Sequence, residues 1–143
     1  MNFDFGNRIK SLRLSRSMTQ EQLDVIVEAV AAAFAREAEA LARMAVEETG
    51  FGNVEDKITK NQFASRRVWE SIKDMKTVGV LKECPGEKLW EVGVPVGVIA
   101  AIVPSTNPTS TVCYKAMIAL KSGNACGEAQ MPRGCFGGKK PDT

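Results

Sequence analysis

Three consecutive polar residues, Ser105, Thr106 and Asn107, stand between an apolar run and a helical pattern. The run from Val92 to Val103 is rich in β-branched residues, which predicts a strand buried on both faces. In open α/β sheets, ligands bind outside the carboxyl ends of the strands. The two hydroxyl groups and the amide are therefore candidates for binding a ligand or a reacting oxygen.

The same residues also have a purely structural interpretation. Asn107 can cap the following helix, and Pro108 suits the first helical position. Lys121 and Gly123 suit the last turn and the stop of that helix. From the spacing alone, a turn and a helix cap are the commoner explanation.

The exact residues of this region favour a catalytic role over a purely structural one. VGVIAAIVPSTNPTST (96–111) and KAMIALKSGNA (115–125) resemble the CoA-acylating aldehyde dehydrogenases, and EETGFGNVEDKITKNQFAS (47–65) does so as well. The resemblance implies that Asn107 donates a hydrogen bond to the oxyanion of a thiohemiacetal. A neutral amide suits this role because it stabilises developing negative charge without competing for protons. The resemblance also implies that Pro104, Ser105 and Thr106 line the nicotinamide side of a cleft.

The reaction implied is oxidation of an aldehyde by NAD through a cysteine thioester, with transfer of the acyl group to coenzyme A. The implied fold is α/β: an incomplete aldehyde-dehydrogenase-like fold with two long N-terminal helices, a β-hairpin, and a buried strand–loop–helix that opens a Rossmann-like domain. The resemblance covers residues 19–125 and represents the N-terminal part of such an enzyme. Since the nucleophilic cysteine is expected beyond this part, we expect the chain alone to be inactive.

The chain contains four cysteines and no histidine, so it lacks the commonest general base and neutral metal ligand. No CxxC pair predicts a zinc site, and no GxGxxG motif is present. Cys113 lies among apolar residues of the segment after Asn107, which predicts a small buried side chain.

Two helices must precede the strand. Apolar spacing predicts the first over 20–49, with Val27, Phe34 and Met44 on its buried side, and the second over about 54–75, with Met75 on its apolar side. The second helix carries a mixed charged face that we expect to be solvated or salt-bridged rather than catalytic; it consists of Glu55, Asp56, Lys57, Lys60 and Asn61.

A hairpin is predicted over 79–91, with Pro85-Gly86 at the centre of a tight turn. In aldehyde dehydrogenases the matching hairpin belongs to the oligomerisation domain. The resemblance therefore implies homo-oligomers, or other dehydrogenase subunits, as partners that meet this edge.

The two ends of the chain fit this picture less well. Residues 1–18 form a leader of uncertain origin, and GNRIKSLRLSRSMTQEQL (6–23) resembles the start of a Cro/phage-repressor-type helix-turn-helix. Residues 126–143 are dense in glycine and proline and lack apolar periodicity, which predicts a disordered tail. A frameshift or a truncated reading frame would produce such a tail.

Composition limits the remaining possibilities. The net charge is +2 without a dense basic stripe, so nucleic acid is not an expected ligand. No apolar run reaches the roughly 20 residues of a membrane span. The first residues lack the basic-then-apolar layout of a signal peptide, so the cytoplasm is the expected location. Two alternatives to the dehydrogenase fragment stay open: a helical module that pairs with a full-length dehydrogenase, and a DNA-binding regulator that lacks a recognition helix.

Overall fold

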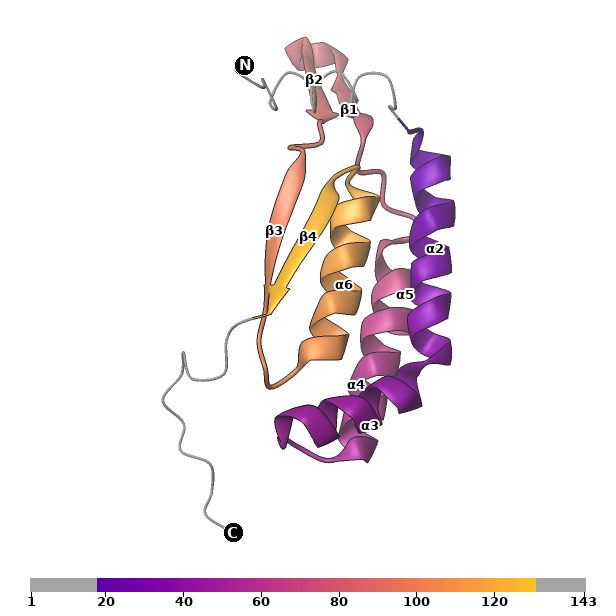
Figure 1. Cartoon of the computed structure of the whole chain (residues 1–143). Helices are drawn as coiled ribbons and strands as arrows, with labels where there is room; N and C mark the ends of the chain where they lie inside the picture. The colour runs from indigo at the N-terminus through magenta and orange to yellow at the C-terminus, as the bar shows by residue number, and fades with distance from the viewer. Residues whose placement is uncertain (1–17, 131–143) are drawn as a thin grey trace, which may run out of the picture.

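The computed structural model describes residues 18–130. A layer of helices lies on one side of a two-stranded sheet, and a hairpin stands at one end (Figure 1). This arrangement confirms the α/β prediction. The helices are α2 (Gln20–Arg36), α3 (Ala38–Thr49), α4 (Val54–Gln62), α5 (Val68–Ile72) and α6 (Pro108–Lys121). The strands are β1 (Gly79–Cys84), β2 (Leu89–Gly93), β3 (Val98–Val103) and β4 (Ala125–Gln130). Within the described residues, no helix has the length and hydropathy that a membrane span requires.

The predicted first helix is divided in two at Glu37, whose φ of −90° and ψ of 10° interrupt the helical geometry. Helix α2 begins with a capping box, in which Thr19 Oγ1 accepts from the Gln22 backbone and Gln22 Oε1 accepts from the Thr19 backbone. The break changes which side chains face the core. In α3 the buried residues are alanines, and Met44, predicted on the buried side, is exposed.

The second helix runs from α4 through a π-helical turn, η1 (Phe63–Arg67), into α5. It ends three residues before the predicted boundary, and Met75 is exposed. The prediction of a solvated or salt-bridged face was wrong for Lys57 and Asn61, which are 4% and 2% exposed. With Ser65 they repeat at intervals of four residues, so they lie on one face of the helix.

The hairpin is confirmed. Strands β1 and β2 pair antiparallel, with Gly79 opposite Gly93 and Cys84 opposite Leu89. The connection is a 3-10 turn, η2 (Pro85–Glu87), rather than a tight turn centred on Pro85-Gly86. Its left-handed residue is Lys88, with φ of 52°. The hairpin exposes several large apolar side chains, namely Leu81, Leu89, Trp90 and Val92.

Strands β3 and β4 pair in parallel across α6, from Val98 opposite Ala125 to Val103 opposite Gln130. The chain therefore contains a complete βαβ unit. The prediction of a disordered tail was wrong for residues 126–130, which form most of β4 because β3 supplies their hydrogen-bonding partners. Residues 131–143 and most of the leader, 1–17, lie outside the described part of the chain.

Burial along β3 alternates, as expected for a strand covered on one face. Ala101 and Val103 are buried, whereas Val98 and Ile102 are 64% and 59% exposed. The prediction of burial on both faces was therefore wrong within the described residues, where α6 packs against one side of the sheet.

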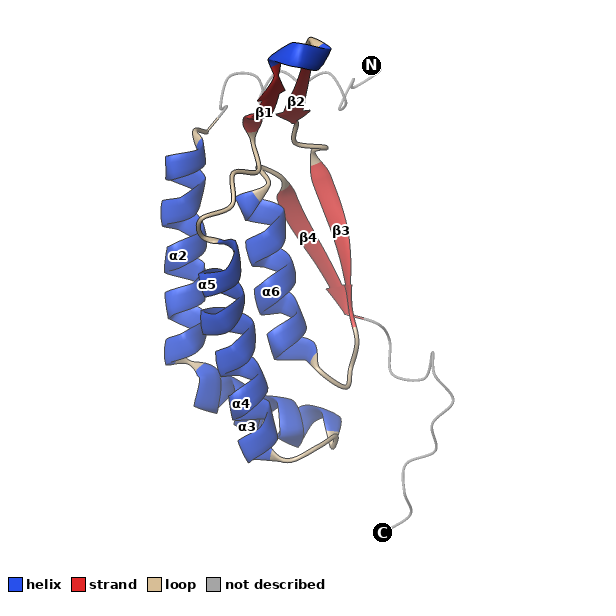
Figure 2. Ribbon diagram, turned by 180° about the vertical axis from the view of Figure 1, so that it is seen from behind, coloured by secondary structure: helices blue, strands red, loops and turns tan. Residues whose placement is uncertain are grey.

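The core forms where α2, η1 and α6 meet. Its buried side chains are Val27, Ala31, Ala64, Cys113 and Met117. Helices α2, α5 and α6 lie side by side around it in both views (Figures 1 and 2).

A polar network joins the helices at the hairpin end. Lys121, 2% exposed, donates to Asp24 Oδ1 at 2.6 Å and to the Lys73 carbonyl at 2.7 Å. Its ammonium also lies 5.8 Å from the centroid of the Trp69 ring. Gln20 Oε1 accepts from the backbone nitrogens of Thr77 and Val78, at 3.0 and 3.2 Å. The network ties the start of α2 and the end of α6 to the segment that leads into the hairpin.

We expect Gly93→Ala to lower the free energy of unfolding by about 1–3 kcal/mol, the range for overpacking. A Cβ at this position would lie 2.3 Å from the Thr77 carbonyl oxygen, so the backbone must shift. Urea titration of the 143-residue chain measures the effect. Gly86→Ala is the matched control, because a Cβ at Gly86 would meet open space. Equal losses in both variants would contradict the steric argument.

We expect Asp24→Ala to cost about 3 kcal/mol, the lower end of the range for breaking a buried pair, because Lys121 would keep a buried charge without a counterion. The lower end applies because the Asp24 side chain is 30% exposed. The control is Glu39→Ala, which breaks an exposed pair with Arg43 and should cost less than about 1 kcal/mol. The same titration compares them, and similar losses would show that burial does not govern the pair.

Candidate functional site

The loop formed by residues 104–107, hereafter the Asn107 loop, connects the end of β3 to the start of α6. It lies at the opposite end of the molecule from the hairpin, near α3 and α4 (Figure 2). Pro104, Ser105 and Asn107 are half-buried, and Thr106 is exposed. The loop therefore stands at the carboxyl end of a parallel strand, as the sequence predicts for a binding site.

Asn107 occupies the N-cap position of α6, and Pro108 is the first helical residue. Its backbone carbonyl accepts from the Thr111 nitrogen at 3.4 Å. Its side chain forms no capping hydrogen bond, and its φ of −140° and ψ of 65° are not helical. The structural interpretation is thus correct for the position but not for the side chain. The Asn107 amide is therefore not used for capping. It lies at the N-terminus of α6, where the helix macrodipole favours negative charge.

Lys57 of α4 reaches the Asn107 loop from a distant part of the sequence. Its Nζ donates to the Thr106 carbonyl oxygen at 2.8 Å. Burial lowers the pKa of the Lys57 amine below its ordinary value, and the charge of Lys60 adds a smaller effect in the same direction. Sequence reasoning missed this residue. The available signal was its four-residue spacing from Asn61 and seven-residue spacing from the buried Ala64.

Asn61 contacts the first turn of α6. Its Oδ1 accepts from Thr109 Oγ1 at 2.8 Å, and its Nδ2 donates to the Ala38 carbonyl at 3.0 Å. Ser65 Oγ donates to the Asn61 carbonyl at 2.7 Å. One buried amide therefore connects α3, α4 and α6 next to the loop.

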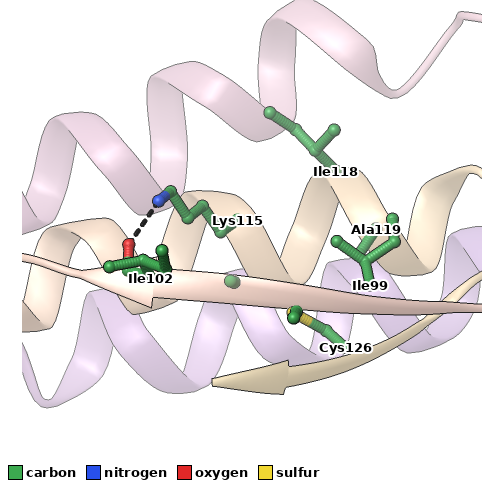
Figure 3. A pocket seen from close by; sticks show the side chains of 8 residues that line it. Ile99, Ile102, Lys115, Ile118, Ala119 and Cys126 are labelled. Carbon is green, nitrogen blue, oxygen red and sulfur yellow. Dashed lines mark hydrogen bonds between the residues drawn. The ribbon is translucent and has the colours of Figure 1, made fainter. Parts of the chain in front are cut away.

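A third contact fixes the end of β3. Lys115 Nζ of α6 donates to the Ile102 carbonyl oxygen at 2.5 Å (Figure 3). Lys115 borders an apolar hollow of about 430 Å³ between β3 and α6, with Ile99, Ile118 and Cys126. The hollow does not include the Asn107 loop, and its charged group is already bonded to β3. Apart from Lys115 and the Cys126 thiol, its lining is apolar.

The loop can stabilise negative charge on a ligand, but a nucleophile is not built beside it in the described residues. Cys113 is fully buried in the core, which confirms its predicted role as a small apolar side chain. Across residues 18–130, no three histidine, cysteine or carboxylate side chains gather to hold a metal ion. The arrangement offers hydrogen-bond donors and a positive environment.

Comparison with known proteins adds an independent finding. The model of the aldehyde dehydrogenase family matches residues 10–126. The match begins inside the segment that resembles a helix-turn-helix. The bifunctional aldehyde-alcohol dehydrogenase of Escherichia coli is 47% identical over 124 residues, which are 87% of this chain and 14% of that protein. The acetylating succinate-semialdehyde dehydrogenase of Clostridium kluyveri is 44% identical over 115 residues, 80% of this chain and 25% of that protein.

Solved structures give the same result. An acetylating aldehyde dehydrogenase from Geobacillus thermoglucosidasius is 56% identical with a TM-score of 0.78, over 80% of this chain and 25% of that one. A probable aldehyde dehydrogenase from Listeria monocytogenes is 52% identical with a TM-score of 0.80, over 87% of this chain and 27% of that one. The chain thus spans about a quarter or less of the length of most of these relatives.

Proposed function

The chain belongs to the aldehyde dehydrogenase family, and we propose that it supplies the oxyanion-binding part of an NAD-dependent, CoA-acylating member. Its sequence corresponds to the N-terminal part of CoA-acylating enzymes. The matched region is a small share of each relative. In this proposal, the activity of the whole enzyme therefore requires segments beyond the matched region.

The observation that carries the proposal is the state of the Asn107 amide. It lies at the carboxyl end of β3 and the N-terminus of α6, and it is not used as a helix cap. A preorganised N–H donor in this position strengthens its bond as a carbonyl oxygen becomes an alkoxide. The positive end of α6 acts on the same oxygen in the same direction.

In the proposed reaction a cysteine thiolate from another part of the enzyme attacks the aldehyde carbon, and the Asn107 amide binds the resulting oxyanion. NAD, when bound, accepts the hydride. Coenzyme A then displaces the cysteine from the thioester. In this proposal Pro104, Ser105 and Thr106 line the nicotinamide side, as the resemblance to the acylating enzymes implies. Their position at the carboxyl end of a parallel strand supports it, because ligands bind there in open α/β sheets.

A second proposed role is subunit contact through the hairpin. Leu81, Leu89, Trp90 and Val92 are exposed on β1 and β2, although each is a large apolar side chain. Both outer edges of this two-stranded sheet also lack a strand partner among the described residues. Such an edge favours pairing with another subunit. This role is compatible with the proposed reaction, since it occupies the other end of the molecule.

We predict that Asn107→Ala lowers turnover by about 10²–10³, the range for losing one oxyanion donor. The test places residues 19–125 into the matching region of the Geobacillus thermoglucosidasius enzyme and measures NADH formation with a short aldehyde and coenzyme A. The loss should appear in kcat more than in KM, since the amide acts on charge that develops in the transition state. A chimera without turnover before any substitution would contradict the proposal.

Asn107→Asp is the matched control in the same chimera. Aspartate caps helices as well as asparagine does, but it cannot donate a hydrogen bond when ionised. The oxyanion role predicts a variant that folds and turns over no faster than Asn107→Ala. Recovery of turnover in Asn107→Asp would show that the residue acts as a cap.

The 143-residue chain on its own should not form NADH from NAD, coenzyme A and aldehydes. The buried position of Cys113 keeps its thiol from a substrate carbonyl, and the chain contains no histidine to activate another cysteine. The assay follows absorbance of reduced cofactor against the active chimera as a positive control. Turnover that disappears in Cys113→Ser would overturn this prediction.

A further inference from the structure

We infer that Lys57 is a positioning residue for Asn107: its buried ammonium fixes the peptide group that joins Thr106 to Asn107, and thereby aims the Asn107 amide. This inference rests on the proposed oxyanion role of Asn107. Lys57 does not touch the reacting atoms in this proposal. It acts through the 2.8 Å hydrogen bond to the Thr106 carbonyl.

A single peptide group connects the Lys57 hydrogen bond to Asn107. The Thr106 carbonyl and the Asn107 nitrogen belong to the same planar group, so holding the oxygen fixes the plane from which Asn107 projects. The rest of Asn107 is weakly restrained. Its side chain makes no cap, and its carbonyl bond to Thr111 is long at 3.4 Å. The Lys57 contact is therefore the strong restraint on the amino side of Asn107.

The charge of Lys57 distinguishes it from an ordinary packing residue. Two lysines are buried among the described residues, and Lys121 pairs with Asp24 at 2.6 Å. Lys57 takes part in no ion pair among the described residues, and burial lowers the pKa of its amine. A buried cation without a counterion is costly. Groups with a perturbed pKa cluster at functional sites, and the hydrogen bond of Lys57 to the Thr106 carbonyl connects this one to the Asn107 loop.

The base of the Lys57 side chain is itself held in place. Asn53 caps α4 by accepting from the Asp56 nitrogen at 2.8 Å, which sets where the helix starts. Gly52 lies beside the lysine stem, where an added Cβ would be 3.7 Å from Lys57 Cε. One turn later, Asn61 binds Thr109 on the other side of the loop. Helix α4 thus contacts the chain both before and after Asn107, at Thr106 and at Thr109.

The test is a double-mutant cycle in the chimera that carries residues 19–125. Lys57→Met keeps the length of the side chain but removes its charge and donors. We expect kcat to fall by about 10- to 100-fold, the scale for a small misplacement of a catalytic group, with little change in KM for the aldehyde. In an Asn107→Ala background the same substitution should cause almost no further loss. Lys60→Met, an exposed lysine on the same helix, is the matched control and should leave kcat unchanged.

Each outcome separates the two proposals. If Asn107→Ala retains full turnover, the proposed function fails. If Asn107→Ala lowers kcat but Lys57→Met does not, only the positioning role fails. Equal losses from Lys57→Met with and without Asn107 would indicate a general structural role and would also overturn it. If Lys57→Met yields less folded chimera, Lys57→Leu, which also lacks a charge and hydrogen-bond donors, takes its place in the cycle, with the same expected and contradicting results.

Discussion

Helix α6 is fixed at both ends by a buried ammonium group. At its C-terminus, its own Lys121 binds Asp24 of α2 and the Lys73 carbonyl at the end of α5. At its N-terminus, Lys57 of α4 binds the carbonyl of Thr106 in the preceding loop. Apolar packing through Cys113 and Met117 holds the middle. Because packing alone is non-directional, these charge-assisted bonds are what set the axial position of α6, and both the sheet and the Asn107 loop depend on that position.

The sheet shows how a long-range constraint can form a strand from a weak local sequence. ACGEAQ (125–130) has few residues with strand propensity, and its composition predicts part of a tail. Asn124 Oδ1 accepts from the Gly97 nitrogen at 2.9 Å, and the Ala125 nitrogen donates to the Gly97 carbonyl at 2.9 Å. These bonds set the register at the first residue of β4, so pairing with β3 follows. Local propensity could not have indicated this, since the partner lies 27 residues earlier.

The sequence predicted the structure where periodicity or capping determines the local conformation. It predicted less where segments that are distant in the sequence contact one another. The Thr19 capping box, the hairpin and the strand–loop–helix around Asn107 are local features, and the structure contains them. The burial of Lys57 and Asn61 depends on tertiary contacts. For the site, the position of the Asn107 loop was predictable, whereas its support from α4 was not. Polar residues on a helix are usually solvated. Here distant partners, the Thr106 and Ala38 carbonyls and the Thr109 hydroxyl, compensate for the loss of water on burial.

In the proposed reaction, the groups around the Asn107 loop have different roles. The N-terminus of α6 and the Asn107 amide favour negative charge on a bound oxygen. The Lys57 ammonium binds the Thr106 carbonyl and so holds the peptide group that precedes Asn107. The Asn107 loop itself contains neither a base nor a thiol. A site of this composition stabilises an anion that another group must create, so its contribution depends on orientation. Rigid support from a separate helix is what such a contribution requires, since a donor that moves away from the oxygen loses most of its effect on the transition state.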